Sequence, residues 1–202
     1  LKMYITQIKN SSKYLLGMIN DLLDLSRVSE DTNAKTNINL HNIILVCIGS
    51  LEKQLLDNNI SIEYNSDNFS SEILSLERSV RQVFLNLLSN AIKYNKKNGK
   101  VTINSTITND IITIIIRDTG IGISTEKMSK LFIPFERLGI GHEIPGTGIG
   151  LAIVKKTVKL MSGTISCKSE KNKYTEFKLE LPLVKIVKDN GKVYNYNNSK
   201  RV

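Results

Sequence analysis

The sequence contains no tryptophan, and its 202 residues include only two cysteines, two histidines and three prolines. Cys47 and Cys167 lie far apart and form no C-x-x-C motif, which excludes a disulfide framework and favours a reduced, cytosolic compartment. No apolar run approaches the roughly 18 residues that a membrane-spanning helix needs, and no signal-peptide pattern is present. We therefore expect a cytoplasmic chain whose fold does not depend on disulfides.

Acidic residues are also fewer than basic ones, and the net charge is +9. Such a balance is compatible with a nucleic-acid partner or a membrane surface. However, the lysines are scattered, no aromatic residues interleave with them, and no nucleic-acid-binding module is recognisable. We interpret the charge as background composition and expect no nucleic-acid partner. The hydrophobic content of 41% is sufficient for one core, so we expect one domain with an appendage.

Residues 1–30 have the pattern of an amphipathic helix. Together with Ser12, the apolar residues Leu1, Ile5, Ile8, Leu15, Ile19 and Leu22 form a heptad seam, alternating spacings of four and three. One helix cannot bury such a seam alone, so we expect a second helix or a second chain against it; packing on its own domain is the alternative. The chain starts within this pattern, which predicts a fragment whose parent could carry a membrane anchor. Residues 31–38 are polar and predict a linker.

The remaining pattern alternates helices and strands and predicts an α/β domain over 39–184. Helices are expected at 39–57, 77–94 and 149–161, and short strands at 60–64 and 72–76. Hairpins are expected about Asn109-Asp110 and through Lys171–Lys173. The arm before Asp118, IITIIIRD, is almost entirely apolar and predicts a central strand. Residues 185–202 are polar and predict a loosely ordered tail.

The helix expected at 77–94 carries a narrow polar arc beside its apolar face. Asn86, Asn90 and Lys93 are spaced so that they share this arc. Amide oxygens suit Mg²⁺, which keeps phosphates and waters as its other ligands, and a lysine suits the phosphates themselves. The alternative interpretation is an ordinary solvated helix face.

Glycines cluster at both ends of the stretch from Asp118 to Leu151, which contains DTGIGIS and GTGIGL. Free N–H groups and the helix dipole favour an anion where a glycine cluster opens a helix. These features predict a nucleotide between Asp118 and Gly146–Gly150. The pattern is not a Walker A loop, because G-x-x-x-x-G-K-[ST] is missing, and no G-x-G-x-x-G opens a Rossmann unit.

Four motifs together, NLLSNAIKYN, DTGIGIS, FIPFER and GTGIGLAI, closely resemble the N, G1, F and G2 boxes of the catalytic ATP-binding domain of sensor histidine kinases. The resemblance covers roughly 40–182. Upstream, SSKYLLGMINDLLDLSRVSE resembles the second helix of the dimerisation and phosphotransfer hairpin. The resemblance implies a two-layer α/β sandwich, the Bergerat fold of the gyrase, heat-shock, histidine-kinase and mismatch-repair ATPases, with helices on one face of a mixed sheet.

The resemblance also implies roles for individual residues. Asp118 would accept a hydrogen bond from the exocyclic amine of adenine; the alternative is a turn aspartate at a strand end. Asn90 would be the principal Mg²⁺ ligand with Asn86 beside it, and Lys93 would contact the phosphates. The other residues expected at ATP are Tyr94, Gly120, Gly122, Ile123, Arg137, Gly146, Thr147, Gly148, Ile149, Gly150 and Leu151. For Arg137 a solvated position is the alternative.

The segment Ser124–Pro145 resembles the ATP lid, with Phe132 and Phe135 docking it on the core or on the helical hairpin. Hydrolytic relatives have a glutamate where Asn86 stands. Asn86 cannot take a proton from water, whereas a neutral imidazole needs no base, so Asn86 favours phosphoryl transfer to histidine.

The acceptor histidine itself is missing, because nothing matches its sequence box and neither His41 nor His142 is expected to replace it. We predict a chain that binds ATP and Mg²⁺ and transfers the γ-phosphoryl to a histidine outside it, and thence to a response-regulator aspartate, as part of a homodimer. It should not phosphorylate itself. Either the first hairpin helix was removed or the parent protein is degenerate. An ATP-binding regulatory or scaffold module without catalysis is the alternative, and a serine kinase of the anti-sigma or mitochondrial type is a third.

Overall fold

Five strands form a mixed sheet in the order β2-β4-β5-β7-β6. The computed structural model describes residues 2–27, 34–69, 71–137, 146–189 and 192–196. Only β2 and β4 run parallel; the other neighbouring strands are antiparallel. The sequence prediction of a central strand before Asp118 is confirmed, since β5 is the middle strand. The bounds are β2 Ser61–Tyr64, β4 Lys100–Thr108, β5 Ile111–Asp118, β6 Thr164–Glu170 and β7 Tyr174–Pro182.

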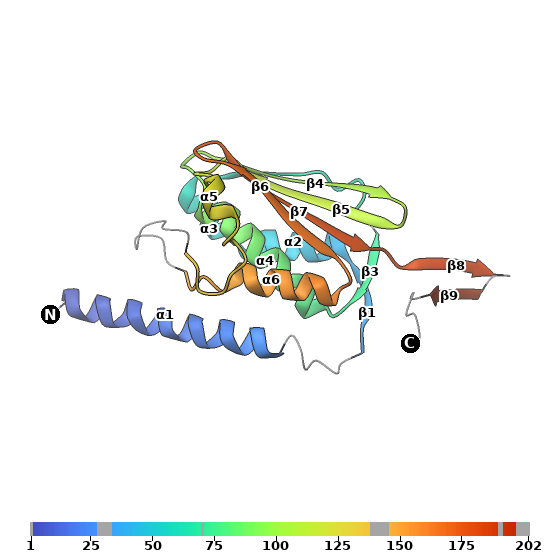
Figure 1. The fold of residues 1–202 in the computed structure, drawn as a ribbon, viewed down its shortest axis with the longest axis horizontal. Helices are drawn as coiled ribbons and strands as arrows, with labels where there is room; N and C mark the ends of the chain where they lie inside the picture. Colours follow the sequence, from blue (N-terminus) through green and yellow to red (C-terminus); the bar gives the residue numbers. More distant parts are fainter. Residues whose placement is uncertain (1, 28–33, 70, 138–145, 190–191, 197–202) are drawn as a thin grey trace.

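Three helices cover one face of this sheet: α2 Leu40–Ser50, α4 Glu77–Lys93 and α6 Gly150–Leu160. α4 lies between the other two and contacts β5, and Figure 1 shows the helices as one layer below the strands. The predicted two-layer α/β sandwich is therefore confirmed. The buried face of α4 carries the apolar residues that its helical periodicity predicts: Val80, Val83, Phe84, Leu87, Leu88, Ala91 and Ile92.

The core lies between the helix layer and the inward face of the sheet. On β5, Ile112, Ile114 and Ile116 are buried, and the alternation of side chains makes Asp118 the next inward residue. The sheet register places Asp118 opposite Thr175 on β7, which also faces inward. The strand alternation therefore places the Asp118 carboxylate and the Thr175 hydroxyl at the end of an apolar core.

The N-terminal helix α1, Lys2–Arg27, lies beside α6, as Figure 1 shows. The described residues of its apolar seam are uncovered within this chain; Ile8, for example, is 66% exposed and Leu15 is 58% exposed. The prediction of a seam that needs a partner agrees with this exposure. In the described residues, no helix combines the length and the apolar character that crossing a membrane would require.

The structure corrects four details of the sequence prediction. The helix expected at 39–57 breaks at Leu51 and continues as α3, Glu52–Asn58. The linker expected at 31–38 ends in a strand, because β1 (Thr36–Asn39) pairs with β3 (Glu72–Ser75). The lid segment begins with a one-turn helix, α5, Thr125–Met128, and the tail contains a hairpin of β8 and β9, Lys185–Asp189 and Lys192–Tyr196. Local periodicity could not predict β1, because its apolar content is a single residue, Ile38.

Candidate functional site

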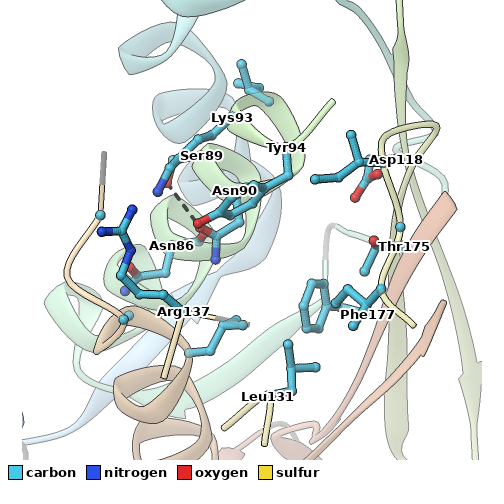
Figure 2. Close-up of a pocket in the computed structure, with 18 of the residues that line it drawn as sticks. Asn86, Ser89, Asn90, Lys93, Tyr94, Asp118, Leu131, Arg137, Thr175 and Phe177 are labelled. Carbon is cyan, nitrogen blue, oxygen red and sulfur yellow. Dashed lines mark hydrogen bonds between the residues drawn. The ribbon is translucent and has the colours of Figure 1, made fainter. Parts of the chain in front are cut away.

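A cavity of about 630 Å³ opens between the end of β5, the C-terminal half of α4 and the start of α6. Figure 2 shows Asn86, Asn90 and Lys93 on one side of this cavity, and Asp118 and Thr175 on the other. Segments far apart in the sequence thus meet around one space, and each contributes polar groups of a different kind.

The polar arc of α4 faces this cavity. Asn86, Asn90 and Lys93 all line it, because the opposite face of the helix is held in the core. The Nδ2 of Asn86 donates to the Gln82 carbonyl at 3.1 Å, which turns its amide oxygen toward the start of α6. Lys93 lies in the last turn, with its Nζ 4.6 Å from the centre of the Tyr94 ring. The polar arc therefore lines a concave site.

Asp118 closes the inner end of the cavity. It is only 4% exposed, and its Oδ1 accepts a hydrogen bond from the Gly120 N–H at 2.8 Å. Burial raises the pKa of Asp118 to about 6, and the backbone N–H groups of Gly120 and Thr175 and the positive charge of Arg117 oppose that rise. The carboxylate is thus a desolvated acceptor at the end of an apolar slot, which is an arrangement that selects a hydrogen-bond donor.

The glycine segment that opens α6 packs directly against the polar arc of α4. A Cβ on Gly150 would lie 2.7 Å from Asn86 Oδ1, and a Cβ on Gly146 would lie 2.3 Å from Lys93 Nζ. A larger residue at either position would force the Asn86 or Lys93 side chain to shift. The cap residue Ile149 makes no side-chain hydrogen bond to the first turn of α6. The N–H groups of that turn and the helix dipole therefore favour an anion beside Asn86 and Lys93.

The loop after Asp118 is anchored on both sides. The Ile121 N–H donates to the Tyr94 carbonyl at 3.0 Å, and the Asn172 N–H donates to the Ile121 carbonyl at 2.7 Å. This loop joins the end of α4 to the β6–β7 turn, so it forms a rigid wall of the cavity. Gly122, at φ +59°, packs against the Glu170 carbonyl in the same turn.

A metal at this site would need amide and phosphate oxygens. Among the described residues, His, Cys, Asp and Glu form no group of three or more that could hold a metal ion. The amide oxygens of Asn86 and Asn90 on one helix face, beside an anion-favouring helix start, are a donor set that fits Mg²⁺ together with a polyphosphate.

Most residues predicted from the sequence come together in this cavity. The lining includes Asn86, Asn90, Lys93, Tyr94, Asp118, Gly122, Ile123, Arg137, Gly146, Thr147, Gly148, Gly150 and Leu151. Two predicted residues do not line it. Gly120 is buried behind Asp118, where a Cβ would lie 2.2 Å from the Tyr94 carbonyl, and Ile149 is fully buried. Phe132 packs against the core, whereas Phe135 is exposed; Gly139, Gly141 and His142 lie outside the described residues.

Several lining residues are not marked by the sequence motifs. They are Gln54, Asn58, Ser89, Ile92, Ile121, Leu131, Glu136, Thr175 and Phe177. Thr175 and Phe177 reach the site through the pairing of β7 with β5, and no local sequence signal marks that register. Ser89 is the exception, because it follows Asn86 at helical spacing and could have been found on the same wheel.

His41 is the one histidine in the described residues. It stands at the start of α2, with its Nδ1 2.9 Å from the Tyr64 hydroxyl, and it is not among the residues lining the cavity.

The sheet, its single helix layer and the cavity between Asp118 and the start of α6 define an ATP-binding domain of the Bergerat type. The chain belongs to the family described as histidine kinase-, DNA gyrase B-, and HSP90-like ATPase, which matches residues 75–185. Within that family the chain is similar to the ATP-binding catalytic domains of sensor histidine kinases, as the resemblance of the four boxes predicts.

Similar proteins carry the same assignment. The sensor histidine kinase RcsC of Salmonella typhimurium is 32% identical over 197 residues, which cover 89% of this chain and 19% of that protein. The chain therefore spans about a fifth of the length of the curated relatives that it matches.

Two solved structures share the fold. Full-length ShkA in complex with AMPPNP has a TM-score of 0.76 at 24% identity, covering 90% of this chain and 38% of that one. The histidine kinase ThkA in complex with the response regulator protein TrrA has a TM-score of 0.69 at 25% identity, covering 90% of this chain and 51% of that one.

Proposed function

We propose that this chain supplies the phosphoryl-donating unit of a two-component sensor kinase. It binds Mg²⁺-ATP and presents the γ-phosphoryl group to a histidine outside this chain, from which the group passes to an aspartate of a response regulator. One observation carries the proposal: a single cavity joins the buried Asp118 carboxylate to an amide-lined helix face and to an uncapped helix start. An adenine at one end and a metal-bound triphosphate at the other would satisfy every one of these groups.

Each group of residues would bind a different part of Mg²⁺-ATP. Asp118 accepts a hydrogen bond from the adenine amine, and Tyr94 covers the face of the base. Asn90, with Asn86 beside it, would hold Mg²⁺, which when bound neutralises phosphate charge. Lys93 and the first turn of α6 bind the phosphates. Arg137 lies at the same end of the cavity, and Thr147 follows Gly146, which packs against Lys93. These groups position and neutralise the triphosphate, which is the main demand of phosphoryl transfer.

Asn86 supports transfer over hydrolysis. Its side chain stands against the start of α6, where a general base for an attacking water would be needed, and a carboxamide cannot take a proton. A neutral imidazole brings its own nucleophilic lone pair. The acceptor we infer is therefore a histidine presented from another helix.

The division of the chain follows from the same proposal. Residues 1–30 would be the second helix of a dimerisation hairpin, 31–38 a linker, 39–184 the catalytic domain and 185–202 a tail. The exposed seam of α1 supports a homodimer, and the free thiols of Cys47 and Cys167 support a cytoplasmic location. The linker would be shorter than the sequence indicates, because Thr36–Asn39 pair with β3. The complex of ThkA with its response regulator supports a partner of that kind.

A regulatory module without catalysis is the competing function. It would need ATP binding alone, whereas the cavity also holds an amide pair for Mg²⁺ and a lysine beside the phosphate end. No feature of the described residues favours it.

The test is phosphoryl transfer to a supplied acceptor. The purified chain is mixed with a separate hairpin carrying the acceptor histidine and with γ-labelled ATP. Acid-labile, base-stable label on the hairpin is the expected result, with none on the chain alone. ATP binding without transfer, under conditions where chain and hairpin associate, would favour the regulatory module.

A further inference from the structure

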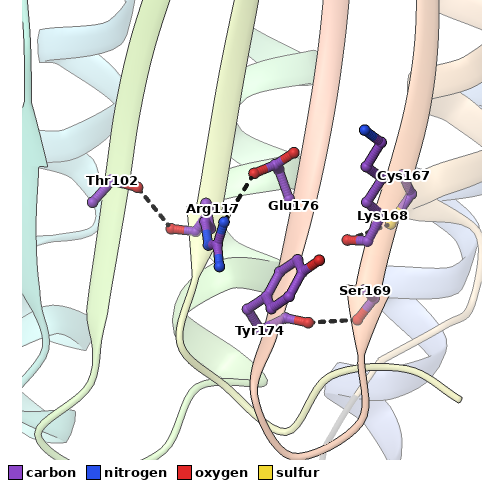
Figure 3. A network of polar contacts seen from close by, with 7 residues as sticks. All are labelled: Thr102, Arg117, Cys167, Lys168, Ser169, Tyr174 and Glu176. Atoms are coloured by element: carbon purple, nitrogen blue, oxygen red, sulfur yellow. Dashed lines mark hydrogen bonds and ion pairs between the residues drawn. The ribbon is translucent and has the colours of Figure 1, made fainter.

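Ser169 on β6 lies outside the residues that line the cavity, yet it contacts two parts of the site. In the β6–β7 register it stands opposite Thr175. Its Oγ accepts from the Ile123 N–H at 2.8 Å and donates to the Tyr174 carbonyl at 2.6 Å, and it lies 3.2 Å from the Thr175 Oγ1. Figure 3 shows the bond from Ser169 to the Tyr174 carbonyl.

The number of hydrogens settles the direction of the third bond. A serine hydroxyl has one hydrogen, and a carbonyl oxygen cannot donate. Two oxygens at 2.6 Å require a hydrogen between them, so the hydrogen of Ser169 is committed to Tyr174. The bond between Ser169 and Thr175 therefore has Thr175 as its donor.

The direction of the Thr175–Ser169 hydrogen bond determines whether Thr175 can donate to a ligand or only accept from it. Thr175 is 7% exposed, lines the cavity and lies opposite Asp118 in the β5–β7 register, and Figure 2 shows both side chains at the same end. With its hydrogen turned toward Ser169, the Thr175 oxygen presents only lone pairs to the cavity. Ionised Asp118 also has only lone pairs to offer. Two acceptors thus face the position that the base would occupy.

We propose that Ser169 is a positioning residue for base selection, which holds Thr175 as an acceptor and so favours a purine with an amine at position 6 over one with a carbonyl there. This inference rests on the proposed binding of an adenine nucleotide at Asp118. Without Ser169 the Thr175 hydroxyl is free to rotate and donate, and an inosine carbonyl is then a suitable partner. Ser169 also holds the Ile123 N–H, but that second contact does not distinguish between the two bases.

The experiment compares the affinities of ADP and inosine diphosphate in the full chain. Dissociation constants are measured by displacement of a fluorescent adenine nucleotide from the wild type and from Ser169→Ala. We expect the preference for ADP over inosine diphosphate to fall about tenfold in Ser169→Ala, corresponding to about one hydrogen bond. Ser169→Thr keeps the hydroxyl and should restore the preference.

Matched variants separate this role from a structural one. Ser166→Ala makes the same chemical change on the exposed face of β6 and should leave the preference unchanged. In a Thr175→Val background, Ser169→Ala should have no further effect on it. An unchanged preference in Ser169→Ala, whether both affinities fall equally or neither changes, overturns the proposal. Failure of the wild type to bind ADP would instead overturn the proposed function.

Discussion

Asp118 carries the most specific prediction at the scale of single residues. Replacing it by asparagine keeps the size of the side chain and an acceptor oxygen but removes the charge and adds a donor that faces the base. We expect Asp118→Asn to weaken ATP binding about tenfold to a hundredfold while the thermal unfolding transition remains cooperative. Calorimetric titration with ATP measures the loss. Unchanged affinity would show that adenine does not bind at Asp118.

The same carboxylate should make the stability of the nucleotide-free chain depend on pH. Its folded pKa of about 6 lies above the ordinary aspartate value of 3.8, so the folded state binds a proton that the unfolded state releases. Protonation between pH 7 and pH 4.5 therefore stabilises the folded state, by about 2 kcal/mol, and this contribution is lost as the pH rises through 6.

Urea unfolding of the wild type and of Asp118→Asn across this range measures the contribution. Because other groups titrate in both proteins, the relevant quantity is the difference between the two free energies of unfolding. The wild type should gain stability relative to Asp118→Asn as the pH falls. A constant difference would contradict a raised pKa at Asp118.

Asn90 should determine the metal dependence of ATP binding. We expect Asn90→Ala to remove most of the gain in ATP affinity that Mg²⁺ produces and to change metal-free binding by less than about threefold, since only the amide ligand is lost. A Mg²⁺ titration at fixed ATP measures this. Ser89→Ala, the neighbouring substitution on α4, should retain the full Mg²⁺ response. A metal titration identical to that of the wild type would show that Asn90 is not a Mg²⁺ ligand.

At the scale of elements, α1 is the helix with an exposed row of apolar side chains. Ile8 and Leu15 are exposed on one seam. If the seam is a dimer interface, Ile8→Glu with Leu15→Glu should convert the chain to a monomer, because like charges would be buried against each other. ATP affinity should stay within about twofold, since the cavity is formed by other elements.

The matched control changes Lys9 and Asn20 to glutamate. Both are exposed on α1 and lie outside the seam, so the dimer should persist. Sedimentation velocity measures the oligomeric state. A wild-type chain that stays monomeric at high concentration would argue that α1 pairs only with an upstream helix.

At the scale of the whole molecule, β1 determines where the catalytic domain begins. Ile38 on this strand is buried, and Asn39 caps α2 by accepting from the Asn42 N–H at 3.1 Å. We expect a chain of residues 34–184 to fold and to bind ATP like the full chain. A chain of residues 40–184 should be less stable by about 3 kcal/mol, the sum of one buried aliphatic side chain and one helix cap.

Urea unfolding of the two truncated chains gives this difference directly. Both end at Val184, whose N–H donates to the Glu72 carbonyl at 3.0 Å, so the C-terminal contact is the same in each. Equal stability would place the domain boundary after Asn39 and restore the longer linker.

The sequence alone was sufficient for the parts of this protein that are encoded locally. Helical spacing placed Asn86, Asn90 and Lys93 on one face, strand alternation made Asp118 the last residue of an apolar strand, and the glycine cluster marked the start of α6. Four boxes in order were sufficient to recognise the family. Each of these signals arises from neighbours along the chain, and periodicity reports such neighbours directly.

Only the tertiary structure decided what depends on contacts between distant segments. The β5–β7 register brings Thr175 to Asp118, and the β6–β7 register brings Ser169 to Thr175, although no motif marks either residue. The linker ends earlier than the sequence predicts, because β1 pairs with β3. Hydrogen bonds to this distant strand stabilise a segment that has only one apolar side chain. The direction of a hydroxyl hydrogen depends on all of its partners at once, and those partners meet only in the folded chain.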